Sequence, residues 1–446
     1  MSRGGRGRTG QAGPVPAHPA RAAGEDAGPV DPARQVALEA LRAVSERDAY
    51  ANLALPALLR RHRLTGRDAA LATELTYGTL RGRGTYDAVL AVCVDRPLGE
   101  LDPPVRDVLR LGAHQLLATR VPDHAAVSAT VGLTRRVLGA GPARLVNAVL
   151  RRVAQADLAT WLDRVAPLDG PDPDAALAVR TSHPAWIVRA LREALRADGR
   201  DEADLPGLLA ADNDPAPVVL AVRPGRGSVE ELLAEAPPGA DGGQGAGGAR
   251  PAPTAHPGRW SPWAVVLPHG DPGRVPAVRE GRAGVQDEGS QLVALALAAA
   301  PNPGPDERWA DLAAGPGGKA ALLAGLAGTR PGTPAHLTAV EINPGRARLV
   351  REALTGSPGP WEVLVADARQ LAADVTAGRT PPYDRVLLDA PCSGLGALRR
   401  RPESRWRRQP ADVAVLAGQQ RELLRAALDV TRPGGLVCYA TCSPHL

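Results

Sequence analysis

The chain contains no phenylalanine, one methionine, four cysteines and a single lysine, Lys319, among its 446 residues. Four cysteines without a C-x-x-C pair are too few for a disulfide framework and lack the spacing of a structural metal site. No apolar run approaches the roughly 18 residues that a membrane span requires. The arginine-rich N-terminal sequence has no apolar segment after it, so we expect no secretory signal. These absences predict a cytoplasmic protein with reduced thiols, no membrane association and no bound metal.

The length and composition predict several folded domains. The 446 residues allow two to four domains, and 49 glycines with 44 prolines stay below the share typical of a wholly disordered chain. Changes in local composition place the boundaries. We expect a disordered basic tail at 1–30, a helical domain at 31–158, a small mixed α/β connecting domain at 159–284 with a flexible insertion at 237–258, and an α/β domain at 285–446.

Apolar periodicity separates these regions. A spacing of three and four residues recurs from residue 32 to residue 153, which predicts an all-helical bundle with short connections. Short β-like runs at 218–222 and 264–267 belong to the connecting region. Beyond residue 286, strands at 309–312, 337–342, 363–366, 385–388 and 436–440 alternate with helices. This alternation is typical of a Rossmann-like, doubly wound parallel sheet.

A glycine-rich turn follows the first of these strands. The sequence DLAAGPGGK at 311–319 lets backbone approach a ligand closely and presents helix N-terminal amides to it. A phosphate-binding P-loop would need glycine and a hydroxyl residue where this chain has Ala313 and Ala320. The dinucleotide-binding fingerprint G-x-G-x-x-G/A is formally matched in this segment, but so short a pattern is weak evidence for a dinucleotide. An adenosylmethionine site uses the same strand end.

Three acidic residues help to decide between these ligands. Glu341, Asp367 and Asp389 each end a predicted strand, so their carboxylates should meet at one edge of the sheet. Three carboxylates suit a neutral or cationic ligand better than a pyrophosphate. The pattern therefore favours S-adenosyl-L-methionine as the cofactor.

Two cysteines follow strands of the same set. Cys392 leaves the strand that ends at Asp389, and Cys442 leaves the last strand, so both thiols should lie beside the cofactor. Cys93 and Cys438 lack this context and are interpreted as core residues.

These motifs together resemble a known family. DLAAGPGGK, AVEINPGR, VADAR, YDRVLLDAPCSGLGALRRRPE and CYATCSPHL are similar, in order and spacing, to the motifs of the RsmB (Sun/Fmu) family of ribosomal RNA cytosine-5 methyltransferases. GVQDEGSQL at 284–292 resembles the entry to its catalytic domain. RLVNAVLRR at 144–152 and ELTYGTLR at 74–81 resemble its NusB-like RNA-binding domain. Family members continue beyond the last motif, so we expect the methyltransferase domain here to be C-terminally incomplete.

The resemblance implies a role for each site residue. Cys442 would be the nucleophile that adds to C6 of cytosine, Asp389 would hydrogen-bond the base, and Cys392 would assist proton removal or enzyme release. The implied cofactor contacts are Ala313, Ala314, Gly315, Pro316, Gly317, Gly318, Lys319, Glu341, Asp367 and Asp389. The only lysine among some fifty arginines suggests that a compact ammonium is required at position 319.

A run of arginines follows Cys392. Between residues 393 and 410, six arginines against one glutamate give a net charge of +5, which equals that of the whole chain. We expect Arg399, Arg400, Arg401, Arg405, Arg407 and Arg408 to bind RNA phosphates. The expected partner is small-subunit ribosomal RNA, and the expected oligomeric state is a monomer. A transfer-RNA cytosine-5 methyltransferase and an inactive RNA-binding or ribosome-assembly factor remain the alternatives.

Overall fold

The computed structural model of the chain describes residues 31–236, 254–268 and 270–445. The predicted tail at 1–30 and most of the predicted insertion at 237–258 lie outside the described residues. The described chain divides into two compact units, which we describe separately. The first comprises residues 31–48, 54–79 and 90–158, and the second comprises residues 49–53, 80–89 and 159–445.

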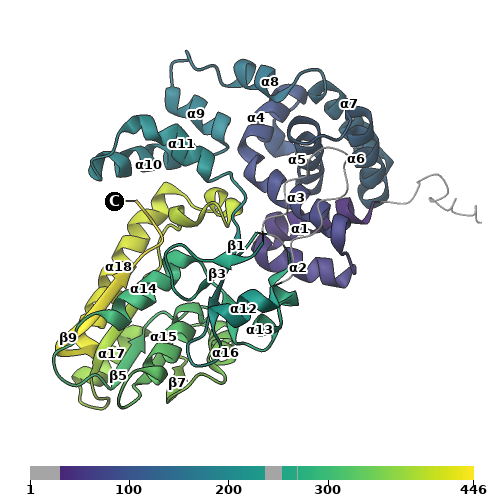
Figure 1. Cartoon of the computed structure of the whole chain (residues 1–446). Coiled ribbons are helices and arrows are strands. Elements are labelled where there is room, and N and C mark those ends of the chain that lie inside the picture. The colour runs from purple at the N-terminus through teal and green to yellow at the C-terminus, as the bar shows by residue number, and fades with distance from the viewer. Residues whose placement is uncertain (1–30, 237–253, 269, 446) are drawn as a thin grey trace, which may run out of the picture. The chain divides into compact units, whose positions relative to one another are not determined.

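Between residues 31 and 153, the described chain forms helices joined by short connections and contains no strand (Figure 1). At its start, the Asp31 side chain accepts a hydrogen bond from Ala33 N at 2.9 Å, and Pro32 occupies the first turn, where its missing N–H costs nothing. The apolar spacing then buries Val36 and Ala40 of the first helix against Leu55. The predicted helical bundle is thus confirmed. Its helices are α1 (Pro32–Arg47), α2 (Ala51–Arg61), α3 (Gly66–Arg81), α4 (Arg83–Cys93), α5 (Pro103–Ala118), α6 (Asp123–Leu138) and α7 (Ala140–Val153).

Four short helices follow before the first strand. They are α8 (Leu158–Val165), α9 (Pro173–Thr181), α10 (Ala185–Ala197) and α11 (Leu205–Ala211). Ile187, Leu191 and Leu209 form an apolar cluster that also contains Leu395 and Leu398. This cluster therefore fixes the segment that follows Cys392.

A small antiparallel sheet connects these helices to the C-terminal domain. Its order is β2 (His256–Pro257), β3 (Ala264–Leu267), β1 (Val218–Val222) and β4 (Ala283–Val285), and α12 (Val229–Glu235) and α13 (Pro276–Arg279) pack on it. The two central strands have the predicted bounds. His256 pairs with Val266, so the C-terminal end of the predicted insertion at 237–258 takes part in this sheet.

The C-terminal sheet is parallel throughout its described strands. Its order is β7 (Trp361–Leu364), β6 (His336–Val340), β5 (Arg308–Asp311), β8 (Tyr383–Asp389) and β9 (Thr431–Ala440). The helices α14 (Glu288–Ala299), α15 (Gly318–Thr329) and α16 (Pro344–Leu354) cover one face, while α17 (Ala368–Thr376) and α18 (Pro410–Val430) cover the other (Figure 1). The predicted doubly wound sheet is therefore confirmed.

Two apolar layers hold this sheet between its helices. On one face Leu323 and Val350 pack with Trp309 of β5. On the other face Leu371 and Ala427 pack with neighbouring strand residues. The central strands β5, β6 and β8 are therefore mostly buried, as expected for a parallel sheet with helices on both faces, whereas the edge strands β7 and β9 are partly exposed.

The strand order creates a switch point between β5 and β8. The chain moves from β5 outward to β7 and then returns to pair β8 with the other edge of β5. In open parallel sheets, ligands bind outside the carboxyl ends of the strands at such a point. The glycine-rich turn after β5 and the Cys392 segment after β8 both leave the sheet there.

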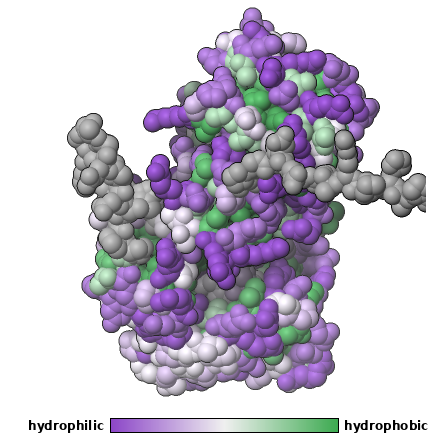
Figure 2. Space-filling model, turned by 90° about the vertical axis from the view of Figure 1, so that its right-hand side faces the viewer, coloured by the Kyte–Doolittle hydropathy of each residue, from purple (hydrophilic) through white to green (hydrophobic). Residues whose placement is uncertain are grey.

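No described helix is long and apolar enough to cross a lipid bilayer. On the face of the molecule shown in Figure 2, hydrophilic and hydrophobic residues are interspersed.

Candidate active site

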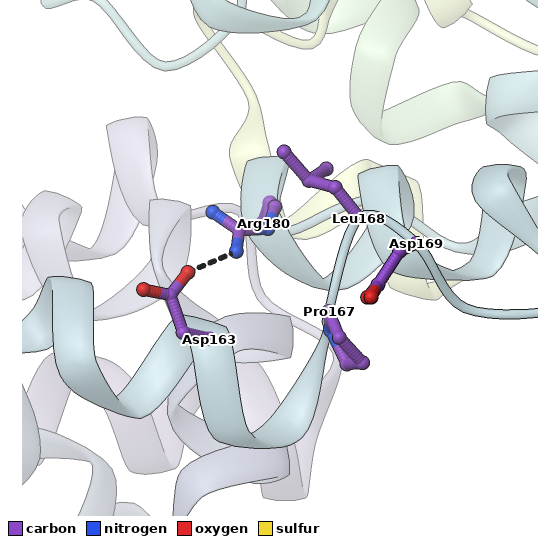
Figure 3. A pocket seen from close by; sticks show the side chains of 5 residues that line it. All are labelled: Asp163, Pro167, Leu168, Asp169 and Arg180. Atoms are coloured by element: carbon purple, nitrogen blue, oxygen red, sulfur yellow. Dashed lines mark hydrogen bonds and ion pairs between the residues drawn. The ribbon is translucent and has the colours of Figure 1, made fainter.

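The hollow drawn in Figure 3 does not have the features of a catalytic centre. It is lined by Asp163, Pro167, Leu168, Asp169 and Arg180. Arg180 Nη2 and Asp163 Oδ1 form an ion pair at 2.5 Å. The lining contains no thiol, glycine turn or strand end, so we locate the candidate site at the switch point of the C-terminal sheet instead.

The glycine-rich turn connects β5 to α15 through left-handed backbone. Gly315 has φ +57° and Gly317 has φ +95°, conformations that residues with a Cβ rarely adopt. A Cβ at Gly317 would also lie 2.8 Å from the Cβ of Ala353 on α16. Glycine at 317 thus allows α16 to pack against the start of α15, where the free backbone amides of a helix N-terminus face the crevice.

Asp311 ends β5 beneath this turn and is buried. Its Oδ1 accepts a hydrogen bond from Ala313 N at 3.3 Å, whereas its Oδ2 has no hydrogen-bond partner among the described residues. Burial raises the pKa of this carboxyl to about 7, which the Ala313 amide and Lys319 oppose. An unsatisfied buried oxygen is costly, so this atom is a candidate to meet a donor or cation from a ligand.

Glu341 follows β6 and already has protein donors on both oxygens. Its Oε2 accepts from Gly315 N at 3.0 Å, and its Oε1 accepts from Asn343 N at 2.8 Å and pairs with Arg346 at 2.7 Å. Arg346 donates to Oε1 from both Nε and Nη2, at 3.0 and 2.7 Å, so Oε1 accepts three hydrogen bonds and Oε2 accepts one. These bonds orient Glu341 and leave the second lone pair of Oε2 for a further donor.

Asp367 lies beyond the end of its strand. The sequence placed it at the strand terminus, but β7 ends at Leu364, and Asp367 instead caps α17 by accepting from Arg369 N at 2.9 Å. The Arg369 guanidinium also pairs with it at 2.6 Å, and hydrogen bonding to that group lowers the pKa of Asp367.

Lys319 and Asp389 bridge the switch point. Lys319 Nζ lies 2.8 Å from Asp389 Oδ2, although seventy residues separate them, and also donates to Ser290 Oγ at 3.3 Å. Lys319 is 15% exposed and Asp389 is 34% exposed at the side chain, so the pair is partly shielded from water. The structure brings together two residues that the sequence assigned to one site from separate motifs.

The thiols of Cys392 and Cys442 lie side by side. Their Sγ atoms are 3.3 Å apart, and Cys442 is exposed. The hydrogen bond with Cys442 lowers the pKa of Cys392 to about 6, although burial opposes this shift. The same hydrogen bond, together with burial, raises the pKa of Cys442. The pair therefore holds one proton between two sulfur atoms at neutral pH. Cys93 is buried, and burial raises its pKa, as expected for a core thiol.

The six arginines of the basic run have different environments. Arg405 has no exposed surface and donates to Ser182 O at 2.8 Å and to Asn213 Oδ1 at 2.9 Å. A guanidinium without exposed surface cannot reach a phosphate, so the prediction of RNA binding is wrong for Arg405 in this conformation.

The other five arginines retain accessible surface. Arg399 donates to Asp214 O and Pro215 O, at 3.3 and 3.1 Å, and Arg400 donates to Pro217 O at 2.9 Å. Arg407 donates to Ala49 O at 2.5 Å. Arg401 is exposed, with its guanidinium 5.0 Å from the ring centre of Tyr50, and Arg408 is partly exposed.

Some residues at this edge were missed from the sequence. Ser290 contacts Lys319, and Arg346 orients Glu341. Ile342 is 59% exposed directly after Glu341. Ile342 could have been predicted, because it is an apolar residue directly after the acidic residue at a strand end. The contact between Ser290 and Lys319 could not, because it depends on how α14 packs against the sheet.

Comparisons with known proteins assign both the helical part and the parallel-sheet part of the chain to families. Residues 298–446 match the family model described as 16S rRNA methyltransferase RsmB/F, and residues 31–155 match the NusB family. The Mycobacterium tuberculosis protein named "Putative methyltransferase Rv1407" is 52% identical over 94% of this chain and 85% of its own length. The Pseudomonas putida protein named ribosomal RNA small subunit methyltransferase B is 34% identical over 92% of this chain and 85% of its own length.

A solved structure shares the fold. The crystal structure of PH0851 superposes with a TM-score of 0.73 over 93% of this chain and 86% of that chain, at 22% identity. The family match, the relatives and the arrangement of motifs lead to one assignment. The chain belongs to the RsmB/F family of 16S rRNA methyltransferases, a family that implies an S-adenosylmethionine-type cofactor, and carries a NusB-family helical domain at its N-terminus.

Proposed function

We propose that the chain methylates C5 of a cytosine in small-subunit ribosomal RNA, using S-adenosylmethionine and a covalent bond between Cys442 and C6 of the base. The observation that carries this proposal is the pair of thiols 3.3 Å apart at the switch point, next to a turn suited to a nucleoside. The hydrogen bond between the thiols has the largest effect on both pKa values, lowering that of Cys392 and raising that of Cys442. The negative charge of Asp389 is close enough to raise the pKa of both thiols by a smaller amount.

The residues of the turn fit the cofactor. Asp311 Oδ2, which accepts no hydrogen bond from the described part of the chain, and the Glu341 carboxylate offer acceptors. The exposed Ile342 offers an apolar surface for a base. Asp367, at the start of α17, would add a further acceptor. When bound, S-adenosylmethionine supplies an electrophilic methyl group. The backbone from Ala313 to Lys319 would hold it at the carboxyl end of β5.

The thiols supply the activation that cytosine needs. C5 of cytosine is a weak nucleophile, and addition of a thiolate to C6 raises its electron density. Cys442 is the exposed member of the pair and would form this bond. Asp389, oriented by Lys319, would hydrogen-bond the N3/N4 edge of the base and stabilise the adduct.

The proton shared by the thiols gives each sulfur a role. Its transfer from Cys442 to Cys392 leaves Cys442 as the thiolate that attacks C6. Cys392 is only partly buried, so it can then release this proton to solvent. As a thiolate it would accept the C5 proton, after which β-elimination breaks the Cys442–C6 bond and frees the product.

The RNA must present an accessible base. A cytosine inside a duplex cannot reach a thiol, so an unpaired or extruded nucleotide is the expected target. We propose that Arg401 and Arg408, with the remaining donors of Arg399, Arg400 and Arg407, contact the flanking phosphates. All groups used here come from one chain, which is compatible with a monomer acting on RNA in the cytoplasm.

The decisive experiment traps the covalent bond. The Cys392→Ala variant, incubated with ribosomal RNA and S-adenosylmethionine, should accumulate an RNA–protein adduct that survives a denaturing gel. The Cys392→Ala/Cys442→Ser double variant should form none, and transfer RNA in place of ribosomal RNA tests the substrate class. An adduct that persists in the double variant, or none with any RNA, would contradict the proposed chemistry.

A further inference from the structure

Hydrogen bonds connect the two loops that carry the thiols. We define the Cys392 loop as residues 390–396 and the Cys442 loop as residues 441–445. Ser393 Oγ lies 2.6 Å from Ser443 Oγ, and Gly396 N donates to Cys442 O at 2.8 Å. At the base of the loops, Ala390 N donates to Ala440 O at 2.9 Å and continues the pairing of β8 with β9. The contact between the two thiols is thus enclosed by bonds on both sides.

The serine pair is less exposed to solvent on the Ser393 side than the thiol pair is on the Cys442 side. Each serine directly follows one of the cysteines in sequence. Ser393 is 7% exposed, whereas Cys442 is exposed. The Cys392 loop is itself supported, because Gln420 of α18 donates to Pro391 O at 2.9 Å and Leu395 belongs to a buried cluster. The Cys442 loop has the serine bond and the Gly396 bond as links to this supported neighbour.

Gly396 provides a second, independent sign of close fit. A Cβ at position 396 would lie 2.9 Å from Cys442 O and 3.3 Å from Cys442 C. These are backbone atoms, so a side chain at 396 would displace the Cys442 loop rather than a flexible neighbour. The hydrogen bond from Gly396 N to Cys442 O, and the absence of a Cβ at Gly396, allow the two loops to approach each other closely. The hydrogen bond between the two serines requires the same close approach.

We propose that Ser393 and Ser443 are positioning residues, whose hydroxyl–hydroxyl bond holds the Cys442 sulfur in hydrogen-bonding contact with Cys392. This inference rests on the proposed function for its catalytic consequence, but its geometric part concerns the thiols alone. Loss of the serine bond lets the Cys442 loop move away from the Cys392 loop. The thiolate of Cys392 then loses its hydrogen-bond donor, and the attacking sulfur is no longer fixed.

The first test measures thiol reactivity without RNA or cofactor. The rate of iodoacetamide modification of Cys392 and Cys442, resolved by peptide mass spectrometry, is followed against pH. The wild-type profile should rise with an inflection near the Cys392 pKa of about 6. In Ser443→Val the inflection should move upward by at least about one pH unit, because the thiolate loses its donor. Ser443→Thr keeps the hydroxyl and should restore the wild-type profile.

The second test measures methyl transfer by the full-length chain. Ser443→Val and Ser393→Ala should each lower kcat by about threefold to tenfold with KM for RNA unchanged, since one hydrogen bond is lost. Their double variant should cost less than the product of the single losses, because the two hydroxyls act on each other. Ser357→Ala, in the segment that precedes β7 at the other end of the sheet, is the matched control and should leave kcat unchanged.

The outcomes separate this inference from the proposed function. An unchanged alkylation inflection in Ser443→Val would overturn the positioning role, whatever the activity. Gly396→Ala provides a check that keeps both serines, and it should shift the inflection in the same direction. Failure of Cys392→Ala to form the RNA adduct would instead overturn the proposed function, and would leave the alkylation result intact.

Discussion

The sulfur atoms of Cys392 and Cys442 lie 3.3 Å apart, although fifty residues separate them in sequence. The contact arises because β8 and β9 are neighbouring parallel strands with Asp389 in register with Ala440. Each strand then ends in a short loop with a cysteine near its start. Parallel pairing at this edge of the sheet therefore converts two separate motifs into one pair of interacting thiols.

This closeness predicts a specific disulfide on oxidation. Diamide takes up one thiolate, and attack by the second thiol displaces the hydrazine and forms the Cys392–Cys442 bond. We expect a loss of two hydrogen atoms per chain, reversed by dithiothreitol and located by peptide mass spectrometry. Cys93 is buried and should remain a free thiol. A bond from Cys392 or Cys442 to Cys438 would contradict the arrangement.

The ion pair between Lys319 and Asp389 predicts that the only lysine of the chain is needed for methyl transfer. In Lys319→Met, Asp389 loses its partner at 2.8 Å and is no longer held in the orientation that the proposed contact with the base requires. A hydrogen bond to a charged group contributes about 1.5–3 kcal/mol, so kcat should fall by about 10- to 100-fold. Lys319→Arg should recover little of this loss, because a planar guanidinium differs in shape and reach from an ammonium.

The control for this prediction is another cation of the same domain. Arg348 pairs with Glu352 at 3.7 Å, with both side chains mostly exposed. Such surface pairs contribute little, so Arg348→Ala should keep wild-type activity. Equal losses in the Lys319 and Arg348 variants would show that cationic charge in general, rather than the contact with Asp389, supports the reaction.

Much of the fold could be predicted from local pattern. The runs at 218–222 and 264–267 became β1 and β3 with the expected bounds, because short apolar segments rich in valine are typical of buried strands. The helix α17 was missed, since Ala368–Thr376 is short and has a mixed pattern. That omission also extended the third strand of the domain to Asp367, which in the structure caps the missed helix.

The location of the site could be predicted, but its internal contacts could not. Carboxyl ends of parallel strands share one edge, which sufficed to bring Asp389, Cys392 and Cys442 together from sequence. The environment of Arg405 depends on tertiary packing against Ser182 and Asn213, which no local pattern encodes. In the sequence, Arg405 is indistinguishable from the exposed Arg401.

The buried Asp311 predicts a pH-dependent stability difference. Burial raises its pKa from 3.8 to about 7. Between these values the native protein binds more protons than the unfolded chain, so the contribution of Asp311 to stability falls as pH rises toward 7. Asp311→Asn removes this dependence and can keep the acceptor for Ala313 N. The melting temperature of the variant, relative to wild type and without cofactor, should therefore be higher at pH 8 than at pH 5.

A surface carboxyl provides the reference for this measurement. Hydrogen bonding to Arg379 lowers the pKa of Asp374, so this group is ionised throughout the interval from pH 5 to pH 8. The effect of Asp374→Asn on the melting temperature should be the same at both ends of that interval. A difference for Asp311→Asn that likewise stays constant would show that Asp311 is already ionised at pH 5.

The basic run predicts two separable phenotypes. Arg405→Ala removes a buried guanidinium that donates to Ser182 O and Asn213 Oδ1, so it should destabilise the chain by about 3 kcal/mol or more.

Arg401→Ala alters an exposed side chain and should leave the melting temperature unchanged. If Arg401 contacts a phosphate, its removal should weaken RNA binding. The slope of the logarithm of the RNA affinity against the logarithm of the salt concentration should then decrease in magnitude by about 1, as expected for the loss of one phosphate contact. Thermal unfolding and salt titrations of RNA binding on both variants check these outcomes. A stable Arg405→Ala protein with a reduced salt slope would mean that Arg405 leaves its buried position and binds phosphate after all.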